Sequence, residues 1–420
     1  MSLFEEFSWR GLIAHSTDPQ ALAAALDGEL TFYVGFDPSA PSLHMGNLLQ
    51  LITAQRLQRA GHRPILLVGG STGLIGDPRQ TSERKLNPAD VVQGWVEKIR
   101  SMVSRFVSFE GDNAALVVNN YDWTVDLTIL DFLRDIGKYF SLNRMLDREV
   151  VKSRLESGIS FTEFSYVLLQ SMDYLELHRR FGASLQTGGS DQWGNITAGV
   201  ELIRKVTGDH VHALSTPLIT KADGTKYGKT ESGAVWLDPT MTSPYAFHQF
   251  FLNVEDATVG NFLRMFTNRS REEIAELETL TKTDPGRRAA QRVVADDLTD
   301  LVHSPAERHQ ATQAAGALFG QGDLSALDAD TLLAASAELP TATWSQLADQ
   351  TILDALVDSG VVASRGAAKR TVLEGGAYLN NQRISQADYR LAADDVLPGG
   401  LIILRRGKKT IGAVRLTTTQ

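Results

Sequence analysis

The chain has 420 residues, enough for two or three domains, and 43% of them are hydrophobic, so a large buried core is available. It contains no cysteine, which excludes disulfides, thiolate catalysis and cysteine-ligated zinc or iron–sulfur sites. The N-terminus has no apolar run suited to a signal peptide, and no stretch approaches the ~18 apolar residues of a membrane span. We therefore expect a cytoplasmic location and no membrane segment.

Charge is unevenly distributed along the chain. The total is −9, yet the segment from Ser364 to the end holds ten Lys or Arg against four Asp or Glu. The net charge of that segment is therefore +6, which leaves −15 for the rest of the chain. A reversal of sign on this scale predicts that the C-terminal segment binds a polyanion.

Strands alternate with helices in the first part of the chain. Residues 31–36 predict a buried strand, and the apolar spacing predicts a helix from about Leu43 to Ala60. A second strand is predicted at residues 64–68, a second long helix begins at Pro88, and a third strand covers residues 115–118. This alternation is typical of a parallel sheet with helical crossovers.

The carboxyl ends of parallel strands form the predicted ligand-binding edge. The first strand ends in a glycine and turn residues, Gly35–Ser39, and the second enters the glycine-rich stretch Gly69–Asp77. Both stretches should therefore lie at this edge.

The middle of the chain continues the same pattern. The spacing predicts a helix from Phe161 to about Arg180, opened by a capping box over Ser160–Glu163. A strand with glycines follows at residues 185–189, a helix begins near Asp191, and residues 214–219 predict a short apolar strand.

The composition then changes. Residues 243–320 have helical spacing, and residues 321–348 are alanine-rich and acidic, which favours a linker or a loosely packed segment. Residues 350–416 begin with helical spacing and end in strand-like runs. The predicted fold is therefore a Rossmann-like α/β domain (1–230), an α-helical domain (231–320), a linker (321–348) and a small basic α+β domain (349–420).

Two segments have features that suit them to binding phosphate groups. His44 and Gly46 open a predicted helix, whose N-terminal N–H groups and dipole attract anions. Lys226, Lys229 and Thr230 lie on a polar, glycine-rich loop, but Asp223 stands where a Walker A motif needs glycine. Alone, the first segment is more often a packing feature and the second a solvated loop.

Other polar groups share faces or loops. Tyr166, Gln170 and Asp173 are spaced by four and three residues, so they share one face of a predicted helix. Buried polar groups without partners cost about 1–3 kcal/mol each, so three on a core face indicate a binding role, although a half-exposed polar stripe is the alternative. The loops Gly73–Pro78 and Gly188–Asn195 combine glycines with acids and amides, and each alone could be a capped turn.

The combination of these motifs is specific. The stretches Tyr33–Ser39, Phe161–Tyr166, Gly188–Asn195 and Lys221–Lys226, together with His44, resemble the class I aminoacyl-tRNA synthetases, and more narrowly the bacterial tyrosyl-tRNA synthetases. The resemblance extends from about residue 30 to residue 416. It implies ATP-dependent activation of L-tyrosine and transfer of the tyrosyl group to the terminal adenosine of tRNA(Tyr).

The resemblance implies roles for individual residues at the tyrosine site. Tyr33 and Asp173 would bind the phenolic hydroxyl of the substrate. The remaining contacts to tyrosine would come from Tyr166, Gln170 and Asp77 at the ammonium group and from Gln192 at the carboxylate.

The resemblance also assigns an ATP site. His44, Gly46 and Asn47 correspond to the HIGH motif, in which Asn47 replaces the second histidine. The KMSKS loop would comprise Lys226, Lys229 and Thr230, and the other nucleotide contacts would be Gly35, Asp37, Ser39, Gly189 and Asp191. A lysine often found after Asp77 is missing; Arg79 could replace it, and Arg84 matches a family arginine. Mg²⁺ would bind to the phosphates, with no metal site on the protein.

The C-terminal segment resembles a small RNA-binding module shared with a ribosomal small-subunit protein. Arg365, Lys369 and Arg370 lie on one helical face and would contact phosphates, although a solvated basic helix is the alternative. The resemblance also implies that the helical domain lies on the anticodon side, and that the chain is a homodimer with residues 120–180 at the interface.

Three other functions compete with this interpretation. A tryptophanyl-tRNA synthetase shares the fold, but Tyr33 with Asp173 favours a phenol over an indole. A non-catalytic RNA-binding factor would have no use for His44, Gly46, Lys226 and Lys229 as an ATP set. A different nucleotidyltransferase would not need the basic C-terminal segment.

Overall fold

The computed structural model describes residues 1–78, 86–220, 227, 229–230, 233–318, 320, 322–337, 339–407 and 410–417, with the backbone alone at 229, 230 and 233. The chain divides into two compact units. The first comprises Met1–Leu237 with Gly260–Ile274, and the second comprises Asp238–Val259 with Ala275–Gln420. Each unit is described by itself.

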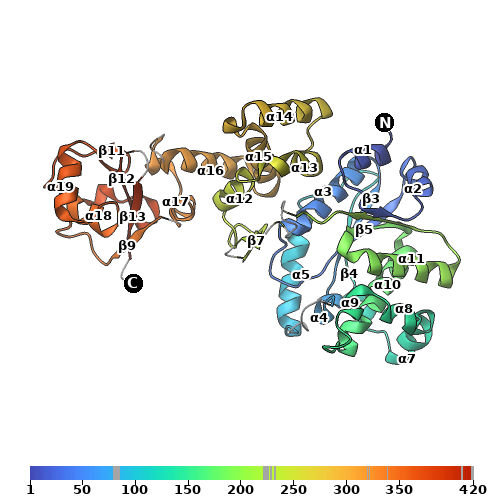
Figure 1. The fold of residues 1–420 in the computed structure, drawn as a ribbon. Helices are drawn as coiled ribbons and strands as arrows, with labels where there is room; N and C mark the ends of the chain where they lie inside the picture. Colours follow the sequence, from blue (N-terminus) through green and yellow to red (C-terminus); the bar gives the residue numbers. More distant parts are fainter. Residues whose placement is uncertain are drawn as a thin grey trace. The chain divides into compact units, whose positions relative to one another are not determined.

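The first unit is built on a six-stranded sheet (Figure 1). Five of its strands run parallel, and β1 joins the edge antiparallel to β6. This confirms the predicted parallel-sheet core. In spatial order the strands are β1 (His15–Ser16), β6 (His212–Thr216), β5 (Ala183–Gly189), β2 (Thr31–Phe36), β3 (Arg63–Val68) and β4 (Leu116–Asn119).

Helices cover both faces of this sheet. The helices α3 (Met45–Arg59) and α5 (Ala89–Val103) connect β2, β3 and β4, and α10 (Phe161–Phe181) and α11 (Trp193–Thr207) flank β5. Figure 1 shows these two pairs on opposite sides of the strands. Successive side chains of a strand point to opposite faces, so Tyr33 of β2 faces the α10 and α11 side and packs in one buried cluster with residues of both helices.

The start of α10 differs in one detail from the prediction. Ser160 caps the helix, because its hydroxyl accepts a hydrogen bond from the Glu163 N–H at 3.2 Å. The Glu163 carboxylate, expected to complete the capping box, accepts from Arg154 Nη1 at 3.1 Å in a buried ion pair. The helix ends at Gly182, whose φ of 70° is a left-handed conformation that glycine adopts readily.

The last parallel strand begins earlier than predicted. β6 covers His212–Thr216, whereas the apolar run suggested residues 214–219. Its register against β5 pairs Leu185 with His212 and Gly189 with Thr216. Pro217 follows immediately and has no N–H to donate, so the ladder ends there.

A group of short helices lies between β4 and α10 and was not predicted from the sequence. The group comprises α6 (Tyr121–Thr124), α7 (Ile129–Asp131), a π-helical turn (Phe132–Ile136), α8 (Leu142–Leu146) and α9 (Glu149–Lys152). Each is too short to produce a periodic apolar pattern.

The second unit combines helices with a five-stranded sheet. Its helices α12 (Pro244–Leu252), α15 (Ala289–Val302) and α16 (Pro305–Leu318) pack against one another. Along the chain, α13 (Asp256–Phe266) and α14 (Arg271–Thr283) lie between α12 and α15. The spatial order of the strands is β11 (Gln382–Arg383), β10 (Ala377–Leu379), β12 (Leu401–Arg406), β13 (Thr410–Leu416) and β9 (Thr341–Trp344).

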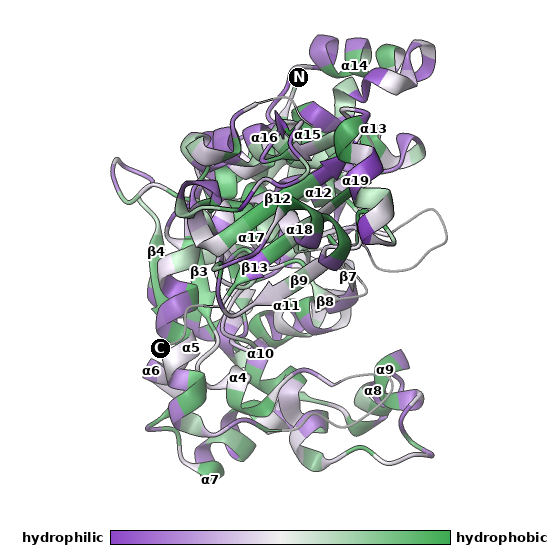
Figure 2. Ribbon diagram, turned by 90° about the vertical axis from the view of Figure 1, so that its left-hand side faces the viewer, coloured by the Kyte–Doolittle hydropathy of each residue, from purple (hydrophilic) through white to green (hydrophobic). Residues whose placement is uncertain are grey.

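Both faces of this second sheet are buried. Leu401 and Ile403 of β12 pack with residues of α16 and α17 (Ala329–Ser336). Ile402 and Leu404 point to the other face and pack with α18 (Ile352–Asp358) and α19 (Arg365–Leu373). Figure 2 shows the hydrophobic colour along β12, as expected for a strand covered on both sides.

Residues 321–348 are not a linker. They contain α17 and β9, and Leu332 of α17 is fully buried in the core of the second unit. Trp344 of β9 is buried on the opposite face of the sheet. The prediction was wrong because β9 pairs with β13, about 70 residues later, and a local sequence pattern does not reveal such a distant partner.

Among the residues that the structure describes, none of the helices combines the length and the apolar character that crossing a bilayer requires.

Candidate functional site

The candidate site lies where the connections of the sheet change direction. From β2 the chain proceeds through β3 to β4, and it then returns to β5 on the other side of β2. The carboxyl ends of β2 and β5 therefore lie side by side at a topological switch point (Figure 1). The predicted stretches Gly35–Ser39 and Gly188–Asn195 follow these two strands, as the sequence analysis expected.

Tyr33 and Asp173 are buried on the same face of the sheet. The Tyr33 side chain is 1% exposed, and its hydroxyl has no hydrogen-bond partner among the described residues. Asp173 accepts from Trp123 Nε1 and from Asn120 Nδ2, each at 2.9 Å. Burial is the main cause that raises the pKa of Tyr33, and the charge of Asp173 adds to it. The unpaired hydroxyl and the carboxylate together could bind one more hydroxyl group.

The environment of Asp173 favours its protonated form. Burial raises the pKa of this carboxyl to about 7, although the hydrogen bonds from Asn120 and Trp123 act in the opposite direction. The negative charges of Asp37 and Glu176 raise it further. Asp173 therefore titrates near neutral pH.

A hydrogen-bond network links Asp173 to the end of β2. Asn120 Nδ2 also donates to Thr72 Oγ1 at 3.0 Å, and the Thr72 hydroxyl donates to Asp37 Oδ1 at 2.6 Å. The second oxygen of Asp37 accepts from the Tyr166 hydroxyl at 2.6 Å. Asp37, expected to contact the nucleotide, thus holds Tyr166 and Thr72 in this structure.

Asp77 is held by two amide side chains. Gln192 Nε2 donates to Asp77 Oδ2 at 2.8 Å, and Asn195 Nδ2 donates to Asp77 Oδ1 at 3.1 Å. Asn195 Nδ2 also donates to Gln192 Oε1 at 2.9 Å, so the three side chains form a closed triangle. Gln170 Oε1 is buried and has no partner among the described residues.

His44 and Asn47 cap the N-terminus of α3. His44 Nδ1 accepts from the Gly46 N–H at 3.0 Å, and Asn47 Oδ1 accepts from the His44 N–H at 3.2 Å. A Cβ at Gly46 would lie 2.8 Å from His44 Cε1, so glycine at this position leaves the imidazole in place. His44 and Asn47 thus form a reciprocal capping box at the start of α3.

The remaining nucleotide candidates lie at the same edge of the sheet, where Gly35, Ser39 and Asp191 are exposed and Gly189 is half-buried. Gly35 is exposed near the end of β2, and the Ser39 N–H donates to the Asp37 carbonyl at 2.8 Å in the turn that follows. Asp191 is exposed after β5, and a Cβ at Gly189 would lie 2.7 Å from its Oδ1. Glycine therefore allows the Asp191 carboxylate to approach the backbone.

Some predicted residues cannot be placed. Lys226, Arg79 and Arg84 lie outside the described residues. Lys229 and Thr230 form the short strand β7, which pairs with β8 (Gly233–Ala234). Only their backbone is described, so their proposed contacts with phosphates stay predictions.

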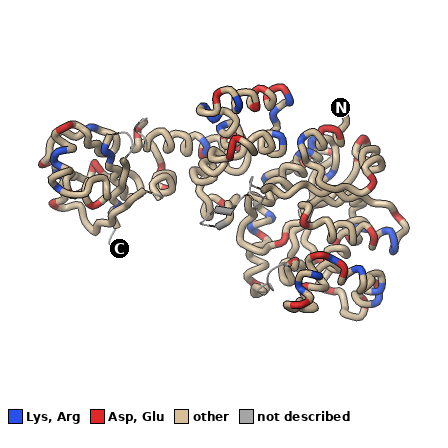
Figure 3. Tube along the Cα trace, in the orientation of Figure 1, with Lys and Arg blue, Asp and Glu red and all other residues tan. Residues whose placement is uncertain are grey.

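The predicted RNA-binding residues lie on α19 in the second unit. Arg365, Lys369 and Arg370 are all exposed, and Arg365 Nη1 forms an ion pair with Asp354 Oδ1 at 3.1 Å. Figure 3 shows Lys and Arg side by side with Asp and Glu on this unit. Not every basic residue of this unit is exposed. Arg405 is buried, and its guanidinium lies 4.2 Å from the centre of the Tyr378 ring.

Five residues that hold the candidate side chains, directly or through one another, were not predicted: Thr72, Asn120, Trp123, Asn195, and Arg148, whose Nη2 donates to Asn195 Oδ1. Asn120 follows the strand β4 at the carboxyl edge of the sheet, where ligands bind in parallel α/β folds, and this position could have identified it. Asn195 belongs to a motif that the sequence analysis described without giving it a role. Trp123 and Arg148 lie on the short helices or their caps, where the sequence had no periodic pattern to interpret.

Comparison with known proteins assigns the family. The model of the class I tRNA synthetases (W and Y) matches residues 25–320, and that of the tyrosine–tRNA ligase SYY-like C-terminal domain matches residues 332–413. The chain therefore belongs to the class I aminoacyl-tRNA synthetases that comprise the tryptophan and tyrosine enzymes.

Close relatives of the chain narrow the assignment within this class. A tyrosine–tRNA ligase of Cutibacterium acnes is 59% identical, covering 98% of this chain and 99% of its own. One of Streptomyces coelicolor is 55% identical, covering 99% of both. A C-terminally truncated mitochondrial tyrosyl-tRNA synthetase of Aspergillus nidulans has a similar structure, with a TM-score of 0.69 and 29% identity over 76% of this chain and 94% of its own. Within its class, the chain is a member of the tyrosine–tRNA ligase family, whose enzymes use ATP as a substrate.

Proposed function

We propose that the chain activates L-tyrosine with ATP at the carboxyl ends of β2 and β5 and then transfers the tyrosyl group to the terminal adenosine of tRNA(Tyr). The observation that carries this proposal is the buried Tyr33 hydroxyl, which has no partner among the described residues and is electrostatically coupled to Asp173. A buried unpaired hydroxyl is costly, and the phenol of a bound tyrosine would satisfy it.

The charges around the site support an amino-acid substrate. Asp77 and the Asp37–Tyr166 pair supply negative charge and acceptors for an ammonium group, and Gln170 offers a buried acceptor without a partner among the described residues. Gln192 lies beside Asp77 and would contact the carboxylate of tyrosine. Tyrosine would thus be held at its phenol by Tyr33 and Asp173 and at its polar end by a separate set.

ATP would bind on the neighbouring helix N-terminus. α3 begins at Met45 with His44 as its cap, and the positive end of its dipole would face the phosphates. Gly46 would allow the nucleotide to lie against the helix, and Gly35, Ser39, Gly189 and Asp191 would complete the nucleotide site. Lys226, Lys229 and Thr230 would close over the triphosphate. Mg²⁺ would arrive with the phosphates and reduce their charge.

The activation step needs no general base, because the attacking carboxylate has no proton to lose. The tyrosine carboxylate oxygen attacks the α-phosphorus of ATP, the bond to the β-phosphate oxygen breaks, and pyrophosphate leaves with its electron pair. In the second step a ribose hydroxyl of the tRNA attacks the tyrosyl carbonyl, the bond from that carbon to the AMP oxygen breaks, and the hydroxyl proton passes to the departing AMP phosphate. Positioning by the fixed side chains and positive charge near the phosphates would supply the acceleration.

The second unit would bind tRNA. The exposed Arg365, Lys369 and Arg370 of α19 would contact phosphates, which position the RNA without reading its sequence. Residues 231–320 would lie on the anticodon side.

We also propose a homodimer. The group of short helices between β4 and α10 exposes large apolar side chains, among them Ile129 (78% exposed), Leu130 (76%) and Leu142 (64%). Such a patch marks an interaction surface. Sedimentation equilibrium should give twice the chain mass, and a monomer mass at micromolar concentration would contradict the homodimer.

Amino-acid-dependent exchange of pyrophosphate into ATP, measured with all twenty amino acids and without tRNA, tests the proposed activity. Exchange with tyrosine alone is expected. Exchange with tryptophan would favour the tryptophanyl alternative. No exchange from folded protein with Mg²⁺ would favour the RNA-binding factor.

A further inference from the structure

Arg148 lies at the start of a hydrogen-bond chain that leads to the proposed amino-acid site. It precedes α9, and its Nη2 donates to Asn195 Oδ1. Asn195 is 4% exposed and lies in the first turn of α11. The guanidinium therefore contacts the triangle of Asn195, Gln192 and Asp77 from outside.

The chemistry of this contact determines how the amides are oriented. An amide side chain can turn by 180° and exchange its oxygen with its nitrogen at little cost in shape. Arginine has only donors, so Asn195 must present its oxygen to Arg148. Its Nδ2 then faces Asp77 and Gln192, and donates to both.

The orientation continues to the next amide. Gln192 Oε1 accepts from Asn195, so the Gln192 nitrogen faces Asp77 Oδ2 and donates to it at 2.8 Å. If Asn195 turned over, its oxygen would face the Asp77 carboxylate, and two acceptors would oppose each other. Arg148 thus disfavours the orientation in which Asp77 loses its Asn195 donor and Gln192 Oε1 faces another acceptor.

Electrostatics are consistent with this geometry. Burial lowers the pKa of Arg148, and the negative charge of Asp77 acts in the opposite direction. The cation and the carboxylate are thus close enough to interact without bonding directly in the described contacts.

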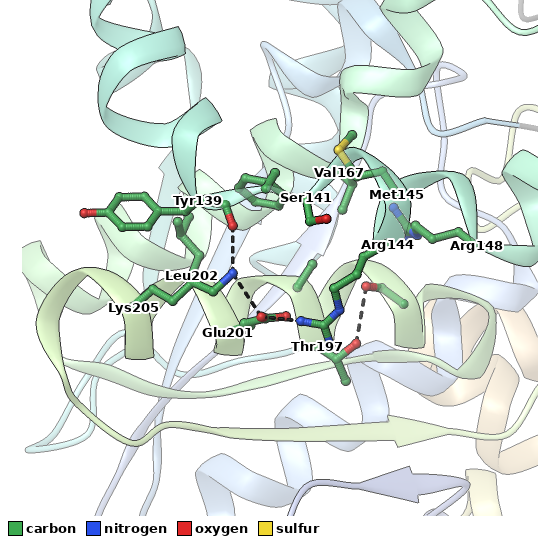
Figure 4. A pocket seen from close by; sticks show the side chains of 13 residues that line it. Tyr139, Ser141, Arg144, Met145, Arg148, Val167, Thr197, Glu201, Leu202 and Lys205 are labelled. Atoms are coloured by element: carbon green, nitrogen blue, oxygen red, sulfur yellow. Dashed lines mark hydrogen bonds and ion pairs between the residues drawn. The ribbon is translucent and has the colours of Figure 1, made fainter.

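Neighbouring basic residues do not share this role. Arg148 lines a pocket of about 340 Å³ together with Arg144, Glu201 and Lys205 (Figure 4). Arg144 Nη1 pairs with Glu201 Oε1, and Lys205 Nζ lies 3.0 Å from the same oxygen. Arg144 has no contact with Asn195 among the described hydrogen bonds, so it is a suitable control.

We propose that Arg148 is a positioning residue for tyrosine binding, which acts by fixing the amide of Asn195 and, through it, Gln192 and Asp77. This inference rests on the proposed function, because it assumes that Asp77 and Gln192 contact the substrate.

The test measures tyrosine binding to the full-length protein by calorimetry, and the KM values for tyrosine and ATP by pyrophosphate exchange. Arg148→Met keeps the length of the side chain and removes its donors, whereas Arg148→Lys keeps a donor and the charge. Arg144→Met is the matched control. Arg148→Met loses the charge-assisted contact, so we expect its tyrosine binding to be about tenfold weaker. Arg148→Lys keeps a charged donor, so we expect a loss of less than about threefold. The KM for ATP should not change in either variant.

A second measurement separates positioning from a general loss of charge. If Arg148 acts through Asn195, adding Arg148→Met to Asn195→Ala should weaken tyrosine binding by less than about twofold more. The inference would be overturned if the two substitutions weakened tyrosine binding additively, or if Arg148→Met bound tyrosine as tightly as the unaltered protein does. Either result would leave the proposed function intact. Absence of tyrosine binding by the unaltered protein would overturn both.

Discussion

Two buried tyrosines that touch each other make opposite use of their hydroxyl groups. The rings of Tyr33 and Tyr174 lie 5.0 Å apart, and both side chains are almost completely buried. The Tyr174 hydroxyl donates to the His212 carbonyl at 2.8 Å, whereas the Tyr33 hydroxyl has no partner among the described residues. The contrast indicates that Tyr174 stabilises the fold and that Tyr33 serves a ligand.

Removing each hydroxyl should therefore have different effects. Tyr33→Phe should leave the free energy of unfolding unchanged or raise it by about 1 kcal/mol, since an unpaired buried group is removed, while tyrosine binding weakens about tenfold or more. Tyr174→Phe, the matched control, should lower the free energy of unfolding by about 1 kcal/mol and leave tyrosine affinity unchanged. Urea denaturation and calorimetry measure both quantities. A loss of stability in Tyr33→Phe equal to that in Tyr174→Phe would contradict the assignment.

Asp173 should make the stability of the ligand-free protein depend on pH. Its pKa is about 7 in the folded state because of burial, and about 3.9 in an unfolded chain. Between these values the folded protein holds a proton that the unfolded chain has lost, so stability from this group falls as pH rises from about 4 to about 7. Above that range the contribution is constant.

Denaturation of the unaltered protein and of Asp173→Asn at several pH values isolates this effect. The free energy of unfolding of the unaltered protein, relative to the variant, should decrease from pH 5 to pH 7 and then level off. A difference that stays the same at every pH would show that the carboxyl is not protonated in the folded state.

At the scale of elements, the entrance to α10 depends on a buried ion pair. The side chains of Arg154 and Glu163 are 4% and 2% exposed, and Arg154 Nε also donates to the Gly158 carbonyl at 3.1 Å. The pair thus fastens the loop before α10 to the first turn of the helix that carries Tyr166, Gln170 and Asp173.

Replacing one partner of this ion pair should destabilise the protein more than replacing both partners. Arg154→Met leaves the Glu163 charge buried and should lower the free energy of unfolding by about 3 kcal/mol. The double variant Arg154→Met with Glu163→Met should regain more than half of that loss. Equal destabilisation in the single and double variants would mean that the ion pair itself is unimportant.

The long elements could be predicted from the sequence, and the short ones could not. β2, α3 and α10 have strong periodic patterns, and their observed bounds agree with the predicted ones to within about two residues. The short helices between β4 and α10 lack such patterns, and β9 was missed because its partner β13 is distant in the chain. Local sequence contains no information about a partner of this kind.

The candidate site, too, depends on contacts between distant residues that the sequence does not reveal. Resemblance to a family predicted Tyr33, Asp77 and Asp173 as substrate contacts, but apart from Gln192 it did not point to the groups that hold them. Asp173 is fixed by Asn120 and Trp123, about 50 residues earlier, and Asp77 by Asn195, 118 residues later. Such contacts arise only when the sheet brings distant strand ends together.

At the scale of the whole molecule, the residues proposed for tyrosine activation and those proposed for RNA binding lie in different units. The catalytic candidates lie in the first unit, and the exposed basic residues of α19 lie in the second. Activation of tyrosine should therefore proceed without α19, whereas tRNA charging should depend on it.

A triple substitution tests this division. Changing Arg365, Lys369 and Arg370 together to alanine should raise the KM for tRNA about tenfold or more and reduce its dependence on salt, because fewer counterions are released on binding. Pyrophosphate exchange should not change. The control is Arg390→Ala, since Arg390 is exposed and paired with Asp349. An unchanged KM for tRNA in the triple variant would exclude α19 from the RNA interface.

The central claim is that the Tyr33 hydroxyl and Asp173 together recognise a phenol. The most direct test is calorimetric titration of the intact protein with L-tyrosine and with L-phenylalanine, in the absence of ATP and tRNA. We predict measurable binding of tyrosine and at least about tenfold weaker binding of phenylalanine, because phenylalanine leaves the buried Tyr33 hydroxyl unpaired and offers Asp173 no hydroxyl donor. Equal affinity for the two amino acids would contradict the account.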